Sequence, residues 1–188
     1  MRTAFSGLVG AVLLGCAVAA PLSAQNSSTA PLVVDLMKDI DGAATKFIAL
    51  AKAMPPAKMS WRPDASARST GEVFLHVASD NYLLPSGFGN AIPASTGIKG
   101  DDFKTLTTYE KRALTGEQIV ADLEQSFAHL KASMAKTTSD DLMKPVTMFG
   151  MKSTAQGMWI LTATHLHEHL GQLIAYARSN GVTPPWSK

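Results

Sequence analysis

The sequence predicts an all-α fold, a four-helix bundle with long loops and a small β-hairpin before the last helix. Apolar residues recur at intervals of three and four positions in four separate segments, which is the period of an amphipathic helix. Before three of those segments, a Ser or Thr is followed three positions later by Glu or Gln, the capping-box pattern that begins a helix. Helices with one apolar face bury those faces against one another, so four of them favour a bundle.

The first two predicted helices are separated by an ordered loop. One helix is expected over about residues 32–54 and the next over about residues 70–86, where Ser69 and Glu72 form the capping box. Between them, "PPAKMSWRPDASARS" contains prolines that stop a helix. The apolar face of the first helix consists of Leu32, Leu36, Ile40, Ala44, Phe47 and Ala51.

The segment 87–114 contains Gly, Pro and Ser, and we expect a loop there with one turn of helix in "TYEKRAL". Thr115 and Gln118 then form the capping box of the third helix. Its apolar face consists of Ile119, Leu123, Phe127, Leu130 and Met134. This spacing predicts a helix that packs into the core by that face.

The end of the chain predicts a hairpin followed by a long helix. "KPVTMFGMKST" alternates around Gly150, as the strands of a small hairpin do. Ser153 and Gln156 form the third capping pattern, and the last helix is expected over about residues 155–179. Gly181 is a natural terminator, because glycine adopts the left-handed conformation that ends many helices.

The first 24 residues have the pattern of a secretory signal peptide. Arg2 is a positive start, "AFSGLVGAVLLGCAVAA" is an apolar core, and "PLSA" offers small residues for cleavage after Ala24. The apolar run is shorter than the roughly 20 residues of a spanning helix, so no stable membrane span is expected. We therefore expect a periplasmic or secreted protein. An alternative, based on "LLGC", is a lipoprotein acylated on Cys16.

Cleavage would leave a linker, residues 25–31, and one domain, residues 32–188. Loss of Arg2 leaves 16 basic against 15 acidic residues, a net charge of +1, and this balance argues against nucleic acid as a partner. Cys16, the single cysteine, would also be removed. A metal site would then use His, Asp or Glu instead of thiolate. A homodimer through helix faces stays open, since no face shows a clear seam.

Three of the five histidines lie in "HLHEHLGQ", residues 165–172. A helix turns about 100° per residue, so His165 and His169 lie about 40° apart on one face, whereas His167 lies on the opposite face. Two imidazoles at i and i+4 can bind one ion together. The surrounding helix is strongly apolar, so these histidines are expected to be buried and to need polar partners. The alternative is a solvated polar face without chemistry.

The candidate third ligand is His76, which lies mid-helix in "GEVFLHVASDNYLL", and His129 is interpreted as a surface residue. The stretch "HLHEH" also matches H-x-x-E-H, a metalloprotease signature in which the glutamate is the general base. Those enzymes take an acidic third ligand from far downstream. Only 19 residues follow His169, and they contain no Asp or Glu, so the protease interpretation is disfavoured.

These elements resemble the DinB-like (DinB/YfiT) family, whose pattern is one histidine in the second helix and H-x-x-x-H-x-G-Q in the last. The matching residues here are His76, His165, His169, Gly171 and Gln172. "MSWRP", "STGEVFLHVA" and "GQLIAYARSNGVTPPWS" are also similar to the family's sequences, and the likeness covers residues 33–186. The resemblance implies a four-helix bundle in which three histidines and water coordinate one divalent metal ion.

The resemblance also implies metalloenzyme chemistry. The family includes thiol-dependent S-transferases and isomerases, which use small cytosolic thiols. A signal peptide would send this chain out of the cytosol, where such thiols are scarce, so thiol transfer is disfavoured for this chain. We expect a metal-dependent hydrolase or transferase that acts on a small-molecule substrate, with zinc, nickel, iron or manganese as the ion. The alternative is a non-catalytic metal- or ligand-binding bundle protein.

Two polar residues are candidates for supporting the site. Asp80, one helical turn after His76, is placed to orient that imidazole, and Gln172 lies on the same face as the histidine pair. Glu168 is a weak candidate for a general base, because it lies about 100° around the helix from His169. The aromatic residues Trp61, Trp159 and Tyr176 are expected in the core or in the wall of a pocket.

Overall fold

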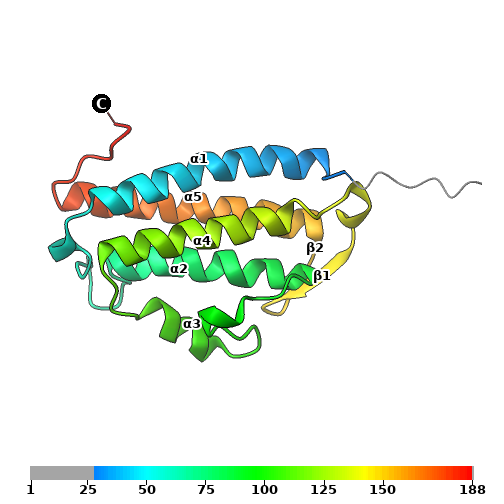
Figure 1. Cartoon of the computed structure of the whole chain (residues 1–188), viewed down its shortest axis with the longest axis horizontal. Coiled ribbons are helices and arrows are strands. Elements are labelled where there is room, and N and C mark those ends of the chain that lie inside the picture. The colour runs from blue at the N-terminus through cyan, green and yellow to red at the C-terminus, as the bar shows by residue number, and fades with distance from the viewer. Residues whose placement is uncertain (1–27, 188) are drawn as a thin grey trace, which may run out of the picture.

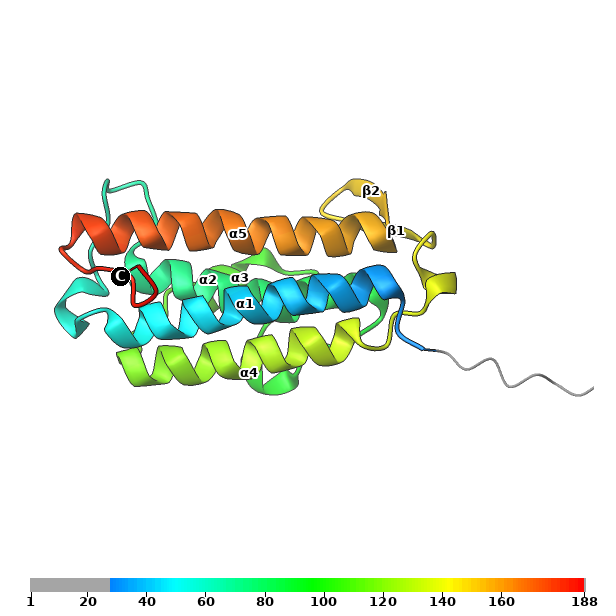
Figure 2. The ribbon, with the colours of Figure 1, turned by 90° about the horizontal axis from the view of Figure 1, so that it is seen from above.

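The computed structural model describes residues 28–187, and in it four long helices lie side by side as a bundle (Figures 1 and 2). The helices are α1 (Pro31–Ala53), α2 (Thr70–Leu83), α3 (Phe103–Glu110), α4 (Gly116–Met134) and α5 (Ala155–Ser179). Helix α1 packs on α4 and α5, while α2 packs on α4, on α5 and on the short helix α3. The predicted all-α bundle is confirmed.

The predicted hairpin is also confirmed, and it precedes α5. Strands β1 (Pro145–Met148) and β2 (Met151–Thr154) pair antiparallel, and Met148 lies opposite Met151 at the turn. Phe149 and Gly150 form the turn with positive φ angles of 54° and 75°. This backbone conformation suits the twist of a two-residue hairpin loop, and it explains the glycine in the sequence pattern.

Helix α2 ends earlier than predicted, at Leu83 instead of residue 86. The chain continues as a tighter 3-10 turn, η2 (Leu84–Phe88). Pro85 lies at the start of this turn and has no backbone N–H, so it cannot donate the next α-helical hydrogen bond. The capping box of Ser69 and Glu72 is present, with Ser69 Oγ accepting from the Glu72 N–H at 3.3 Å.

The helix in the long connection differs from the prediction of a single turn in "TYEKRAL". Helix α3 has eight residues, begins at Phe103 and ends at Glu110. It begins earlier because Asp102 is its N-cap, with a side-chain oxygen that accepts from the Lys104 N–H at 3.0 Å. A lone Asp without the capping-box partner gave no clear start signal in the sequence.

The start of α5 is capped by Thr154, not by the predicted Ser153. Thr154 Oγ1 accepts from the Gly157 N–H at 3.2 Å. Ser153 belongs to β2, where it pairs with Val146. Its backbone is part of the hairpin, so the helix cap falls on the next residue. At the other end the predicted terminator is confirmed, because Gly181 has a φ of 73° and follows directly on the helix cap.

One continuous core runs between the four long helices. The predicted apolar face of α4 is buried throughout, and on α1 the residues Ile40, Ala44, Phe47 and Ala51 are buried. Leu32 and Leu36, near the start of α1, are only half-buried. The largest fully buried side chain is Trp159 at the start of α5.

The chain is already packed just before α1. Thr29 Oγ1 donates to the Ala135 carbonyl at 2.6 Å, and the Ala30 N–H donates to the Thr137 carbonyl at 2.8 Å. Thr29 and Ala30, which the sequence assigned to a linker, thus lie against the residues that follow α4. The predicted signal peptide, its cleavage site and Cys16 lie outside the described residues. Within residues 28–187, no helix is both long and apolar enough to cross a membrane.

The capping box of α2 leads to a stability prediction. Ser69 is buried and satisfies an otherwise unpaired N–H of the first turn. The substitution Ser69→Ala is therefore expected to lower the free energy of unfolding by about 1 kcal/mol, measured by urea denaturation. The exposed Ser60 nearby makes no side-chain hydrogen bond within residues 28–187, and Ser60→Ala is expected to change stability little. Equal effects of the two substitutions would contradict the capping role.

Candidate metal centre

Three histidines from two helices meet between α2 and α5. His76 comes from α2, and His165 and His169 come from α5. Each offers one ring nitrogen, and the three nitrogens lie within 4.8 Å of one another. The ring centroids are 4.4 Å apart for the α5 pair, and they are 4.6 and 5.4 Å from His76 to His169 and His165. These three histidines could hold a metal ion.

His165 and His169 lie on one side of α5, and His167, which lies between them in the sequence, is on another side. His165 and His169 face α2, whereas His167 faces α1 and bonds to Asp39 through Nε2 at 2.8 Å. The side chain of His167 is 49% exposed, and that of His165 is 26% exposed. His169 is buried. The structure thus brings together the three residues that the sequence selected and leaves His167 outside the cluster.

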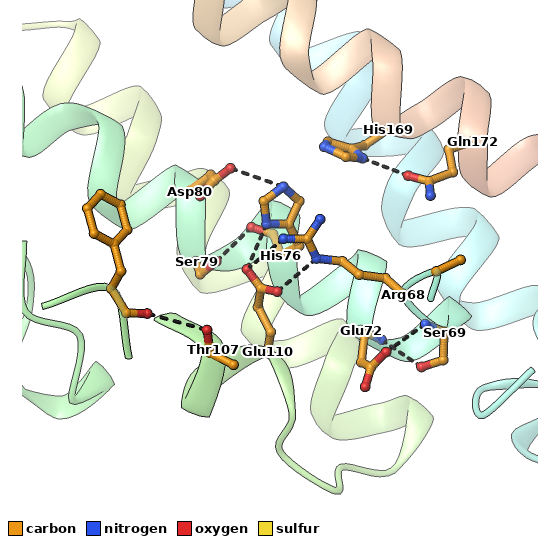
Figure 3. Close-up of polar contacts among 12 residues, drawn as sticks. Arg68, Ser69, Glu72, His76, Ser79, Asp80, Thr107, Glu110, His169 and Gln172 are labelled. Carbon is orange, nitrogen blue, oxygen red and sulfur yellow. Dashed lines mark hydrogen bonds and ion pairs between the residues drawn. The ribbon is translucent and has the colours of Figure 1, made fainter. Parts of the chain in front are cut away.

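Each histidine of the cluster has an oxygen partner on one ring nitrogen. Nδ1 of His76 is 2.8 Å from Glu110 Oε1, and Nδ1 of His169 is 2.8 Å from Gln172 Oε1 (Figure 3). Nε2 of His165 is 2.8 Å from Asp80 Oδ2. Since each of these oxygens accepts, each ring donates from that nitrogen, and in a neutral imidazole the other nitrogen carries the lone pair that can bind a metal.

This donor arrangement fits a divalent metal ion. Histidines that bind metals almost always donate their second ring nitrogen to a carboxylate, an amide or a carbonyl oxygen, which fixes the tautomer. Three imidazole nitrogens around one ion at about 2.1 Å would lie roughly 3.4 Å apart. The nitrogens here lie within 4.8 Å of one another, and all three rings have an outer oxygen partner of the kind that metal-binding histidines use.

Asp80 has a different main partner from the one predicted. It was expected to orient His76, one turn before it on α2. Its Oδ2 instead lies 2.8 Å from Nε2 of His165 and 3.4 Å from Nε2 of His76. Because α2 packs directly on α5, a carboxylate one turn beyond His76 reaches the ring across the helix interface. Gln172 contacts a histidine of the cluster, as predicted.

Glu110 and Arg68 are parts of the site that the sequence did not indicate. Glu110, the last residue of α3, bonds to His76 and also to Arg68, whose Nε lies 2.8 Å from Glu110 Oε2 (Figure 3). Arg68 precedes the cap of α2. Glu110 is 34 positions from His76 in the chain, and it follows a loop whose path no local pattern defines.

Helix α3 is held in place by its Tyr109, next to Glu110. The Tyr109 hydroxyl donates to Asp122 of α4 at 3.0 Å, and Arg112 bonds to the same carboxylate. The Arg112 guanidinium also lies 3.6 Å from the centre of the Tyr109 ring, a cation–π contact. These contacts anchor α3 on α4 and thereby position Glu110 beside His76.

A second route of hydrogen bonds closes the network around the histidines. Gln172 Nε2 donates to the Tyr176 hydroxyl at 3.0 Å, and that hydroxyl donates to the Arg68 carbonyl at 3.3 Å. Arg68 in turn contacts Glu110. Tyr176, which was expected in the core or a pocket wall, is buried and connects the two sides of the site.

The family profile described as DinB superfamily matches residues 39–173, most of the chain. The chain belongs to the DinB superfamily. A search of curated proteins finds no match.

Two solved structures of DinB-like proteins share the DinB fold of this chain. The one from Bacillus cereus is 14% identical with a TM-score of 0.66, and the match covers 81% of this chain and 95% of that chain. The one from Bacillus subtilis is 18% identical with a TM-score of 0.61, and it covers 79% of this chain and 94% of that chain. At these identities the likeness shows the fold alone.

Burial and neighbours shift two pKa values at this DinB-family site. Burial lowers the pKa of His169, the nearby His76 and His165 lower it further, and the bond to Gln172 opposes them. A neutral imidazole is the form that binds a metal. For Glu110, burial raises the pKa, but the hydrogen bonds to His76 and Arg68 outweigh it and hold the pKa below its usual value. Glu110 therefore stays ionised near neutral pH.

A cleft opens beside the histidine cluster. Its volume is about 670 Å³, and its walls include His169, Gln172, Glu110, Arg68 and Glu168. The cleft is open to solvent, so a small molecule can reach His169 from this side. Glu168, the weak candidate for a general base, thus lines the same cleft as His169.

His129 and the tryptophans Trp159 and Trp61 lie outside the histidine cluster. His129, interpreted as a surface residue, is half-buried; its ring lies 5.3 Å from that of Tyr82, and its Nε2 has no partner within residues 28–187. It is covered because α2 and α4 pack closely there, and burial and then Lys136 lower its pKa. Trp159 is in the core, as expected, and Trp61 lies edge-on to Tyr176 at 5.2 Å.

The role of Glu110 can be tested by metal affinity. The substitution Glu110→Gln keeps the shape but removes the charge that holds the His76 ring, so metal affinity is expected to fall at least about tenfold. Competition with a chromophoric chelator measures this change. Glu124→Gln on the exposed side of α4 is the matched control and should leave affinity unchanged. An unaltered affinity in Glu110→Gln would show that Glu110 does not support a metal ligand.

Proposed function

We propose that this DinB superfamily protein binds one divalent metal ion through His76, His165 and His169 and acts as a hydrolase or transferase on a small molecule. The observation that carries the proposal is the cleft beside the cluster, whose wall includes His169. A structural ion is enclosed by its ligands, whereas a catalytic ion keeps a position open to substrate. The open cleft therefore favours catalysis over a purely structural ion.

The donor set narrows the choice of ion. Imidazole ligands suit zinc, nickel and iron, whereas manganese, the fourth candidate ion, more often takes oxygen ligands. Three neutral ligands leave the charge of the ion undiminished. Such an ion would acidify a water molecule or polarise a substrate oxygen. No cysteine lies within residues 28–187, so thiolate does not contribute to the described site.

The residues of the chain have separate tasks in this proposal. Asp80, Glu110 and Gln172 hold the three rings in fixed orientations through their outer nitrogens. Glu168 is an exposed carboxylate on the cleft wall, where it can take up a proton from a substrate or from water. Fixed ligands with a free acceptor nearby are what hydrolysis or group transfer needs.

The test is an activity screen combined with metal analysis. Purified protein loaded with each of the four ions is assayed against ester, amide and thiol-transfer substrates, and Glu168→Gln is assayed in parallel. Metal-dependent turnover that His169→Ala abolishes is the expected result. Stoichiometric metal without turnover on any class would instead favour the alternative, a non-catalytic metal- or ligand-binding protein.

We also propose that the chain is exported and cleaved after Ala24. The support is the charge, apolar run and small residues of its first 24 positions. Cell fractionation with mass measurement of the product is expected to give a soluble chain that begins at Gln25. The substitution Cys16→Ser should not alter export, whereas a lipid-modified product lost in that variant would establish the lipoprotein alternative. An uncleaved chain in the cytosol would contradict export.

A further inference from the structure

The cleft beside the histidine cluster is lined mainly by polar and charged side chains. Three of them are cationic, Arg62, Arg68 and Lys111, and three are acidic, Glu72, Glu110 and Glu168. The apolar side chains on its wall are two alanines, Ala65 and Ala67. A site of this composition does not select a ligand by apolar burial, so charge and hydrogen bonding must decide what it binds.

Two of the acidic side chains are already engaged within the protein. Glu72 accepts from the Ser69 N–H at 2.7 Å as part of the helix cap, and it also pairs with Arg62. Glu110 bonds to His76 and Arg68. Their oxygens therefore face protein partners, and their charge supports the cap of α2 and the ring of His76.

The arginines are held by these carboxylates but keep unused donors. Arg62 contacts the Ala67 carbonyl at 3.1 Å and Glu72 at 3.1 Å, and Arg68 contacts Glu110 through two nitrogens. A guanidinium has five N–H donors, so each arginine keeps several for a ligand. Their side chains are 39% and 44% exposed. Two pre-oriented guanidiniums with free donors are a recurring means of binding carboxylates and phosphates.

Lys111 adds a cation on the same wall, directly after α3. It is exposed, and it makes no ion pair within the part of the chain from residue 28 to residue 187. Glu168 is the one acidic residue of the cleft wall in that part of the chain that likewise has no ion pair. The spare hydrogen-bond donors on the cleft wall therefore belong mainly to Arg62, Arg68 and Lys111.

We infer that the cleft selects small molecules that carry an oxyanion, a carboxylate or a phosphoryl group, at a distance from the reacting group. Arg62, Arg68 and Lys111 bind the oxyanion, while the reacting group lies at the histidine cluster. This inference rests on the proposed metal-dependent function, because the ion would bind the other end of the same molecule. It adds the class of substrate and the residues that recognise it.

The test uses matched metal-binding probes on cobalt(II)-loaded protein. Butyrohydroxamate and succinate monohydroxamate have the same metal-binding head and similar length, but only the second ends in a carboxylate. A phosphonate-tailed hydroxamate is the third probe. Binding is followed by the visible absorption of cobalt. Each anionic probe is expected to bind at least about tenfold more tightly than butyrohydroxamate, and the better of the two identifies the oxyanion.

Variants assign the preference to residues. Lys111→Gln and Arg62→Gln are each expected to reduce the preference for the anionic probe several-fold while leaving butyrohydroxamate affinity unchanged. Lys46→Gln, an exposed position on α1 outside the cleft, should keep the full preference. Equal affinity of charged and neutral probes in the unaltered protein overturns the inference and leaves the metal proposal intact. If no probe perturbs the cobalt spectrum, the open metal site itself fails, and the inference fails with it.

Discussion

Alanine at His165 or at His169 is expected to abolish stoichiometric binding of a divalent ion. Each substitution removes one of three nitrogens that lie within 4.8 Å of one another, and the remaining two do not complete a site. Metal content after dialysis, measured by inductively coupled plasma mass spectrometry, should fall from about one ion per chain to nearly none. Full metal retention in both variants would refute the site.

His167→Ala is the matched control for these two substitutions. His167 lies between the pair in the sequence but faces α1, where it bonds to Asp39. It is half exposed, so its removal should leave both metal content and fold unchanged. Loss of metal in His167→Ala would mean that the histidine faces are assigned wrongly.

Thermal unfolding adds an independent readout of the same site. An ion that binds only the folded chain stabilises it by about 2.7 kcal/mol when its concentration is a hundred times its dissociation constant. A higher Tm on metal addition is therefore expected for the unaltered protein and for His167→Ala. The two variants that lack a ligand should show no such rise, although each still folds.

The largest effect on stability is expected for Trp159→Ala. Trp159 is fully buried, its ring stacks on Phe88 with centroids 4.0 Å apart, and its Nε1 donates to Thr137 Oγ1 at 3.0 Å. The substitution leaves a cavity and removes the partner of a buried hydroxyl, so it should lower the free energy of unfolding by about 3–5 kcal/mol. Urea denaturation measures this loss.

The adjacent residue supplies the control. Ile160 is 41% exposed, and Ile160→Ala should change the free energy of unfolding by less than about 1 kcal/mol. A similarly small effect for Trp159→Ala would show that the start of α5 is not packed as described. Domains are stable by only about 5–15 kcal/mol, so Trp159→Ala removes a large part of the total.

Most of the helices could be predicted from local sequence. Ser69 with Glu72 and Thr115 with Gln118 form the capping boxes that the structure contains, because the interacting atoms are three residues apart. The helix at Phe103 was placed wrongly, since its cap at Asp102 has no such reciprocal partner. The cap of α5 was wrong by one residue, because pairing with β1 decides where the helix can begin.

Some residues of the candidate site could also be predicted from local sequence spacing, and others could not. The α5 pair and its neighbour Gln172 follow from helical spacing, which brings residues three and four positions apart onto one face. His76 was selected as a histidine in the middle of the second helix, and the family resemblance supported it. Asp80 was assigned to His76, the ring nearer to it in the sequence. Its shorter contact is with His165, and that contact depends on how α2 packs on α5.

By itself, the sequence determined the four long helices, the hairpin and the pair of histidines on one helix face, since all of these depend on contacts within a few residues. Only the tertiary structure decided that Glu110 and Arg68 complete the site. Arg68 and Glu110 meet although 42 positions separate them, through a loop and a short helix anchored on α4. Such contacts form because buried polar groups need hydrogen-bond partners, and the packing of the helices decides which groups lie within reach. Sequence spacing therefore does not predict them.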